Sequence, residues 1–307
     1  MKKFLILLLI ISYSCDTTQY NSDKIEFDKK EYSEAFQLID YWLEAQKDYE
    51  KLPGLTAIVT DKNETKWVRS YGSSNGVEPM NIENTFSICS ISKLFTAVAI
   101  MQLVEDGKIN LDDPIQKVLP WFDIYSAFDD APDLTIKSIL SHSSGLPRES
   151  NHPYWSGPDF PFPSKESVVN ELKNQEMLYP PSKYYQYSNL GLSLLGFIVE
   201  EITQSSFDDY VNQNILIPLS MTDTKTYMST DDYGKNLALG YSSLNRDVVR
   251  EKVNFFNADG IAAAAGFTSN VLDIAKFARW QMNLLASLEK NILLPEPLRS
   301  MHEVRWD

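Results

Sequence analysis

The segment from residue 84 to residue 107 carries the most distinctive hydrophobic pattern in the chain. From Ser90 onward it predicts one helix, which Gly107 would end because glycine adopts a left-handed helix terminus at little cost. Apolar side chains occupy nearly every side of this helix: Ile91, Leu94, Ala97, Val98, Ala99, Ile100 and Met101. A helix with this pattern packs inside a protein, so we expect it to be buried.

The pattern before this helix predicts a helix and a hairpin. Apolar residues recur at helical spacing within residues 31–50. Leu55–Thr60 and Thr65–Tyr71 then predict two strands joined by a short turn. An isolated two-stranded hairpin is marginally stable in water, so we expect further strands beside it.

The pattern after the central helix predicts a mostly helical region. Helices are expected at Leu134–Leu140 with Thr135 as a candidate N-cap, Leu190–Thr203, Phe207–Ile215 and Val271–Leu285. Residues 151–163 hold five prolines or glycines and predict a long loop of the kind that covers a site. Residues 262–270 are small and favour tight packing.

Composition narrows the function classes. The chain has 307 residues, of which 43% are hydrophobic, enough for a sizeable core. Its net charge of −14 excludes nucleic-acid binding, which needs a basic surface. Of its two cysteines, Cys15 belongs to a leader segment, so no disulfide with Cys89 is expected. No cysteine or histidine cluster has zinc spacing and no glycine-rich phosphate loop occurs, so we expect neither a metal nor a cofactor.

The first 15 residues predict a secretory signal peptide. Two lysines precede an apolar run from Phe4 to Ile11, which is too short to span a bilayer, and small residues follow. Cys15 directly afterwards resembles a bacterial lipoprotein processing site, although Ser12 stands where a leucine is usual. The alternative is an ordinary signal peptide with an incidental cysteine.

The lipoprotein interpretation sets the expected location. Lipidation of Cys15 would anchor the protein to a membrane in the periplasm or on the cell surface. Residues 16–30 are polar and predict a tether, and residues 31–307 predict one domain.

Ser90 and Lys93 are the first candidates for chemistry. Residues three apart lie on one helix face, so the hydroxyl and the amine can meet. Both the helix dipole and burial disfavour a cation there and lower the pKa of Lys93. A neutral amine could then take a proton from the serine. The same spacing recurs at Ser287 and Lys290, but in a polar segment typical of a solvated helix end.

A second candidate nucleophile is Ser74. Residues 72–76 match the Gly-x-Ser-x-Gly elbow of α/β-hydrolases, which must open a helix. Pro79 and its neighbours make a poor helix start, so the segment predicts a loop instead.

Two Tyr-x-Asn pairs and one histidine complete the candidates. Tyr187 and Asn189 precede an apolar helix, where their side chains can point into a cleft. The second pair, Tyr210 and Asn212, falls inside a predicted helix and is interpreted as structural. His142 is either a base or, as is more common, a residue that holds its loop by hydrogen bonds.

Several segments in this order together resemble the β-lactamase-related serine hydrolases. They are Phe86–Ala97, Gly107–Pro114, Leu140–Leu146, Tyr187–Gly191, Ala263–Ser269 and Asp273–Phe277. The family contains class C β-lactamases, penicillin-binding proteins, related esterases and D-amino-acid peptidases. The similarity runs from about residue 35 to the end of the chain.

The resemblance implies a fold and a set of roles. The fold would be α/β (α+β), with a mixed sheet, flanking helices and a mostly helical inserted region. Ser90 would be the acylated nucleophile, and its N–H one oxyanion donor. Lys93 and Tyr187 would share the proton transfers, and which of them is the base differs between members. Asn189 would position Lys93 or bind the substrate.

The sequence departs from the family in one respect. The family carries a third motif, Lys-Thr-Gly or His-x-Gly, on a strand near its C-terminus, and none follows Phe267 here. We therefore expect the chain to stop before its last strands. The resemblance predicts a serine hydrolase acting on a small-molecule or peptide substrate with an ester, amide or β-lactam bond. The alternative is a catalytically incomplete member that acts as a binding lipoprotein. Which substrate is bound depends on pocket loops and not on the fold.

Overall fold

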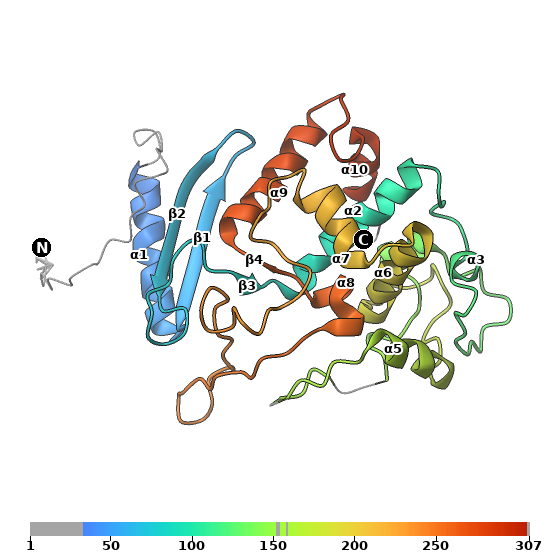
Figure 1. Ribbon diagram of the computed structural model, residues 1–307, viewed down its shortest axis with the longest axis horizontal. Coiled ribbons are helices and arrows are strands. Elements are labelled where there is room, and N and C mark those ends of the chain that lie inside the picture. The colour runs from blue at the N-terminus through green and yellow to red at the C-terminus, as the bar shows by residue number, and fades with distance from the viewer. Residues whose placement is uncertain (1–32, 152–153, 158, 306–307) are drawn as a thin grey trace, which may run out of the picture.

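The computed structural model describes residues 33–151, 154–157 and 159–305 (Figure 1). The predicted signal peptide, Cys15 and the tether lie outside these residues. Its helices are α1 (Ser33–Tyr49), α2 (Ser92–Glu105), α3 (Ile115–Val118), α4 (Ile136–Leu140), α5 (Lys165–Glu171), α6 (Asn189–Thr203), α7 (Phe207–Val211), α8 (Ala262–Ala265), α9 (Val271–Leu285) and α10 (Pro295–Met301). Its strands are β1 (Gly54–Thr60), β2 (Thr65–Gly72), β3 (Phe86–Ser87) and β4 (Thr268–Ser269).

The predicted hairpin is present and lies between two helices. β1 and β2 pair antiparallel, and within the described residues no third strand joins them. Figure 1 shows α1 on one side of the hairpin and α9 on the other. The Phe36 ring of α1 stacks on Trp67 of β2 at 6.2 Å between centroids. On the other side of the hairpin, Arg279 of α9 donates to the Thr65 hydroxyl of β2 at 2.9 Å.

The second sheet is a short antiparallel pairing of β3 and β4. Phe86 lies opposite Ser269, and the Ile88 N–H donates to the Phe267 carbonyl at 2.9 Å. This pairing joins the start of the central helix to a segment near the end of the chain. It thereby fixes the point at which the chain enters α2.

The central helix is largely buried, as predicted. Its residue Phe95 is fully buried and packs on Phe267 and Phe277, with ring centroids 5.1 and 4.5 Å away. The prediction was wrong at Ile91 and Leu94, which are 42% and 47% exposed. They lie near exposed Ser90, on the side of the helix that opens to the surface.

The start of this helix also differs from the prediction. Ser90 lies in a 3₁₀ turn, η1 (Cys89–Ile91), and the α-helix begins at Ser92. Cys89, just before Ser90, has a positive φ of 43°. Positive φ is uncommon for a residue with a side chain, so the backbone turns sharply at this point.

The predicted helix at 190–203 is confirmed as α6, and it packs closely on α8. The Ser188 hydroxyl caps it by accepting from the Gly191 N–H at 2.9 Å. A Cβ added to Gly196 would lie 2.5 Å from the Ala263 Cβ, so only glycine allows this approach. The small residues predicted to pack tightly therefore bring α6 and α8 together.

The remaining helices agree with the sequence in most respects. Thr135 caps α4 in a capping box with Ser138, as its position predicted. α9 has the predicted bounds. The helix expected at 207–215 is divided, because α7 ends at Val211 and a π-helical turn, η3 (Asn212–Leu216), follows. In the part of the chain that the structure describes, no helix has the length and apolar character needed to cross a membrane.

Candidate active site

Three side chains from separate segments meet at the exposed end of α2. The Ser90 Oγ lies 2.7 Å from the Tyr187 hydroxyl and 3.2 Å from the Lys93 Nζ. Ser90 belongs to the turn before α2, Lys93 to its first turn, and Tyr187 to the loop before α6. The structure therefore brings together the serine, lysine and tyrosine that the sequence singled out.

Lys93 is held by three acceptors. Besides Ser90, its ammonium donates to the Asn189 Oδ1 at 2.7 Å and to the Ala264 carbonyl at 2.8 Å. An ammonium has three protons, so each has a partner. A neutral amine could keep the two shorter bonds and direct its lone pair at Ser90. The geometry thus suits both protonation states of Lys93.

Burial moves the ionisation of Lys93 toward neutral pH. The residue is 8% exposed, and desolvation lowers its pKa to about 8, the direction that the sequence predicted. The charge of Arg148 lowers the pKa as well, whereas the negative charge of Glu149 raises it. A useful fraction of the neutral amine is therefore present near pH 8.

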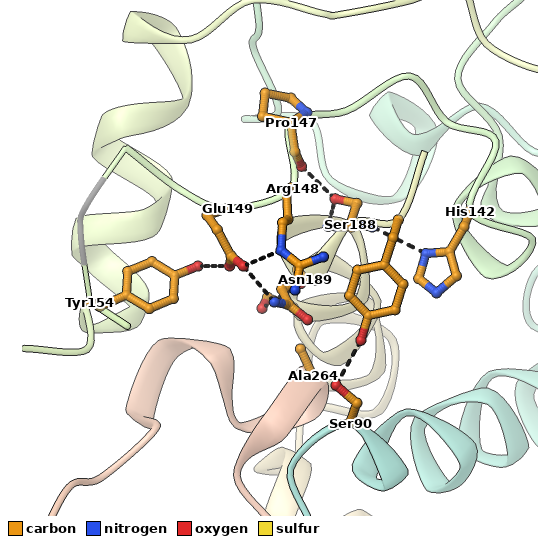
Figure 2. Close-up of polar contacts among 12 residues, drawn as sticks. Ser90, His142, Pro147, Arg148, Glu149, Tyr154, Ser188, Asn189 and Ala264 are labelled. Carbon is orange, nitrogen blue, oxygen red and sulfur yellow. Dashed lines mark hydrogen bonds and ion pairs between the residues drawn. The ribbon is translucent and has the colours of Figure 1, made fainter. Parts of the chain in front are cut away.

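Tyr187 is supported by a histidine and an arginine. The His142 ring packs against the Tyr187 ring at 4.5 Å, and the Arg148 guanidinium lies 4.8 Å from the same centroid. The Nδ1 of His142 accepts from the Ser188 N–H at 3.2 Å (Figure 2). Burial lowers the pKa of His142 to about 4, so it stays neutral and acceptor-capable. His142 therefore has the loop-holding role rather than contact with Ser90.

Asn189 links Lys93 to an acidic side chain. It is the first residue of α6 and is 2% exposed. Its Oδ1 accepts from Lys93, and its Nδ2 donates to the Glu149 Oε1 at 2.7 Å. Figure 2 shows Glu149 surrounded by Asn189, Arg148 and Tyr154. Of the two predicted roles of Asn189, its contacts fit the positioning of Lys93.

Sequence reasoning missed Glu149 and the Ala264 carbonyl. Glu149 follows the recognised Leu140–Leu146 segment by three residues, and no periodicity marks it. The one available signal was an acidic residue close after a recognised segment. A backbone carbonyl such as that of Ala264 leaves no signal in side-chain patterns.

The competing candidates lie elsewhere. Ser74 is 2% exposed in the turn after β2, where its hydroxyl donates to the Glu78 carbonyl at 3.5 Å, and no helix begins there. Ser287 donates to the Glu289 carbonyl, whereas Lys290 pairs with Glu105 of α2. The second Ser-x-x-Lys pair is therefore not a second site.

The second Tyr-x-Asn pair lies in the helical segment where the sequence predicted it. Tyr210 lies in α7 and Asn212 begins the π-helical turn that follows. Among the described residues, no group of three or more histidine, cysteine, aspartate or glutamate side chains could hold a metal ion.

A cavity of about 270 Å³ adjoins Lys93 and His142. Its walls are mostly apolar side chains of α2, α4, α6 and α10: Leu94, Ala97, Met101, Leu140, Leu192 and Met301. Of the Ser90, Lys93 and Tyr187 group, Lys93 therefore borders a small and mostly apolar space.

Comparison with known proteins decides the family. A family model described as Beta-lactamase matches residues 39–305. The chain belongs to the beta-lactamase family. Beta-lactamase-like protein 2 of Dictyostelium discoideum is 29% identical over 243 residues, which are 77% of this chain and 44% of that protein. The chain spans about half the length of the curated relatives it matches.

Solved structures show that this beta-lactamase family chain has the family fold. The octameric penicillin-binding protein homologue from Pyrococcus abyssi aligns with a TM-score of 0.74 and 26% identity, over 89% of this chain and 62% of that one. EstCE1, described as a hydrolase with promiscuous acyltransferase activity, aligns with a TM-score of 0.71 over 86% of this chain and 76% of that one. Its 21% identity shows the fold alone. The family and the fold class expected from the sequence motifs are confirmed.

Proposed function

We propose that the protein is a serine hydrolase that forms an acyl-enzyme on Ser90 and acts on ester, amide or β-lactam bonds. The observation that carries this proposal is the position of the Ser90 hydroxyl between the Lys93 amine and the Tyr187 hydroxyl. A hydroxyl needs a nearby base to become a nucleophile, and an amine with a lowered pKa supplies one. Membership of the beta-lactamase family and the likeness to a hydrolase fold support the same reaction class.

In acylation, neutral Lys93 takes the hydroxyl proton of Ser90 while the Oγ attacks the carbonyl carbon. The carbonyl electrons move to the oxygen, which the Ser90 N–H is expected to stabilise. When the intermediate collapses, Tyr187 gives its proton to the leaving atom. The products of this half-reaction are the acyl-enzyme, a protonated Lys93 and a Tyr187 phenolate.

In deacylation, the Tyr187 phenolate takes a proton from the attacking water. The acyl–oxygen bond to Ser90 breaks, and protonated Lys93 returns its proton to the serine. The resting state is restored, and one water has been consumed. Lys93 is therefore the proposed base of acylation, and Tyr187 acts as the acid first and the base second.

Turnover of nitrophenyl esters by the full chain tests this proposal. Ser90→Ala should abolish the catalysed rate, because it removes the hydroxyl to which the Lys93 Nζ donates. Ser287→Ala is the matched control, since it removes the serine of the other Ser-x-x-Lys pair and should leave the rate unchanged. Activity that survives Ser90→Ala would overturn the assignment. A wild-type chain that binds esters, peptides or lactams without turning them over would favour the incomplete, binding member instead.

The location of the protein is a separate proposal. We infer from the leader that the protein is exported and anchored through a lipid on Cys15, in the periplasm or on the cell surface. Radiolabelled palmitate supplied to a bacterial host should label the wild-type chain and not Cys15→Ala. Equal labelling or equal membrane retention of the two would contradict the anchor.

A further inference from the structure

The orientation of the Asn189 amide depends on a carboxylate outside the Ser90, Lys93 and Tyr187 group. A carboxylate accepts hydrogen bonds and cannot donate them, so the amide end that faces Glu149 must be the NH₂. That bond is 2.7 Å long, from the Asn189 Nδ2 to the Glu149 Oε1. The amide oxygen is thereby left facing Lys93, whose Nζ lies 2.7 Å from it. Glu149 thus determines which end of the amide Lys93 meets.

Glu149 is itself firmly held. The hydroxyl of Tyr154 donates to its Oε2, and the Nε of Arg148 lies 3.2 Å from its Oε1 (Figure 2). Tyr154 is fully buried, and burial together with Glu149 raises its pKa, so it remains a donor. Arg148 and Tyr154 from its own loop face Glu149, as does neutral Asn189 from α6, and Lys93 of α2 senses its charge. Tyr125, Lys173 and Glu176 line the same pocket as Glu149.

We propose that Glu149 is a positioning residue: its carboxylate fixes the Asn189 amide, and this amide holds Lys93 against Ser90. The inference rests on the proposed function, since it assigns a role in that reaction. It goes beyond the Ser90, Lys93 and Tyr187 group because Glu149 touches neither Ser90 nor a reacting atom. Its influence passes through two consecutive hydrogen bonds, from Glu149 to Asn189 and from Asn189 to Lys93.

Removing the charge of Glu149 should lower the pKa of Lys93 in two ways. The negative charge of Glu149 favours protonated Lys93, so its loss lowers the pKa of that lysine. Without the carboxylate, the Asn189 amide is also free to turn its NH₂ toward Lys93. A neutral amine can accept from that NH₂ but an ammonium cannot, so this too favours the neutral form.

The test reads the ionisation of Lys93 directly in the full chain. Competitive acetylation with acetic anhydride across a pH range, followed by peptide mass spectrometry, gives the titration midpoint of Lys93. Glu149→Gln keeps the shape of the side chain and should lower this midpoint by about 0.5 pH unit or more. A midpoint equal to that of the wild type would overturn the proposal.

Glu201→Gln is the matched control. Glu201 is exposed near the other end of α6, so the variant loses the same charge far from Lys93. Twelve residues of helix separate it from Asn189, which corresponds to about 18 Å. Its Lys93 midpoint should match the wild type, and a shift equal to that of Glu149→Gln would show a non-specific charge effect and overturn the proposal.

A second variant separates the position of the carboxylate from its charge. It also provides the test if thermal melting shows that Glu149→Gln does not fold. Glu149→Asp keeps the charge but withdraws the carboxylate by one methylene. It should slow labelling of Ser90 by a fluorophosphonate about threefold or more while the Lys93 midpoint stays closer to the wild type. An unchanged labelling rate would overturn the positioning role.

The two proposals fail in different ways. The titration of Lys93 can be read in a chain that hydrolyses nothing, so absent turnover would contradict the serine hydrolase and leave this readout intact. Ser90-dependent turnover with an unshifted Lys93 in Glu149→Gln would contradict the role of Glu149 alone.

Discussion

The Ser90 Oγ and the Tyr187 hydroxyl lie 2.7 Å apart, although 97 positions separate the two residues in the chain. Two contacts outside the site bring them together. The pairing of β3 with β4 fixes where the chain enters α2. The close approach of Gly196 to Ala263 draws α6, and with it the loop that carries Tyr187, toward the start of α2.

Lys93→Arg should abolish hydrolysis and leave the fold intact. Arginine keeps the positive charge but is not deprotonated in proteins, so it cannot take the Ser90 proton. The loss should be about a hundredfold to ten-thousandfold in kcat/KM for a nitrophenyl ester. Circular dichroism and thermal melting provide the control for folding. Near wild-type turnover would exclude Lys93 as the base.

Tyr187→Phe should also lower kcat strongly, by about a hundredfold or more. The variant removes only the hydroxyl, and the ring can still pack against His142 and Arg148. Tyr210→Phe is the matched control, because Tyr210 of α7 belongs to the other Tyr-x-Asn pair, which we interpret as structural. Equal rates in the two variants would show that the Tyr187 hydroxyl transfers no proton.

The pH dependence of kcat/KM should show an acidic limb. The base must be neutral to accept a proton, and burial lowers the pKa of Lys93 to about 8. Activity should therefore rise with pH up to about 8 and level off above it. A profile that stays flat between pH 6 and 9 would contradict neutral Lys93 as the reacting form.

His142 should make the fold sensitive to acid. Its pKa is about 4 in the folded chain against an ordinary value of 6.5. Below pH 6.5 the unfolded chain binds a proton that the folded chain does not, so stability falls as the pH drops from 6.5 through 4. At pH 4.5 the loss of stability is about 2.5 kcal/mol, or about 3–5 °C in Tm.

His142→Asn removes this titration. Asparagine tolerates the positive φ of 54° at this position and can accept from the Ser188 N–H. Between pH 7 and pH 4.5 the Tm of the variant should fall less than that of the wild type, as measured by thermal melting. Equal losses of Tm in the two proteins would contradict a buried neutral His142.

The sequence predicted the elements whose signals are local. The bounds of α9 and, within one residue, of α6 follow from the local pattern of apolar residues. The hairpin likewise follows from two strand-like runs joined by a short turn. The exposure of Leu94 could not be predicted, because the spacing of apolar residues does not say which part of a helix borders an open surface.

The candidate site was predictable only in part, because local patterns do not show which distant residues meet. Ser90 and Lys93 are neighbours on one turn, and Tyr187 and Asn189 were recognised from a motif. The contact between Asn189 and Glu149 joins residues 40 positions apart. That between Lys93 and the Ala264 carbonyl joins residues 171 positions apart, and neither contact is marked by a periodic pattern.

Covalent labelling of the full chain with a fluorophosphonate tests the central claim most directly. Intact mass should show addition of one label, and peptide mapping should place it on Ser90, which stands beside Lys93. The label should be absent from Ser90→Ala and present in Ser287→Ala. A label on Ser74, or a label that persists in Ser90→Ala, would show that the nucleophile lies elsewhere and that the proposed mechanism is wrong.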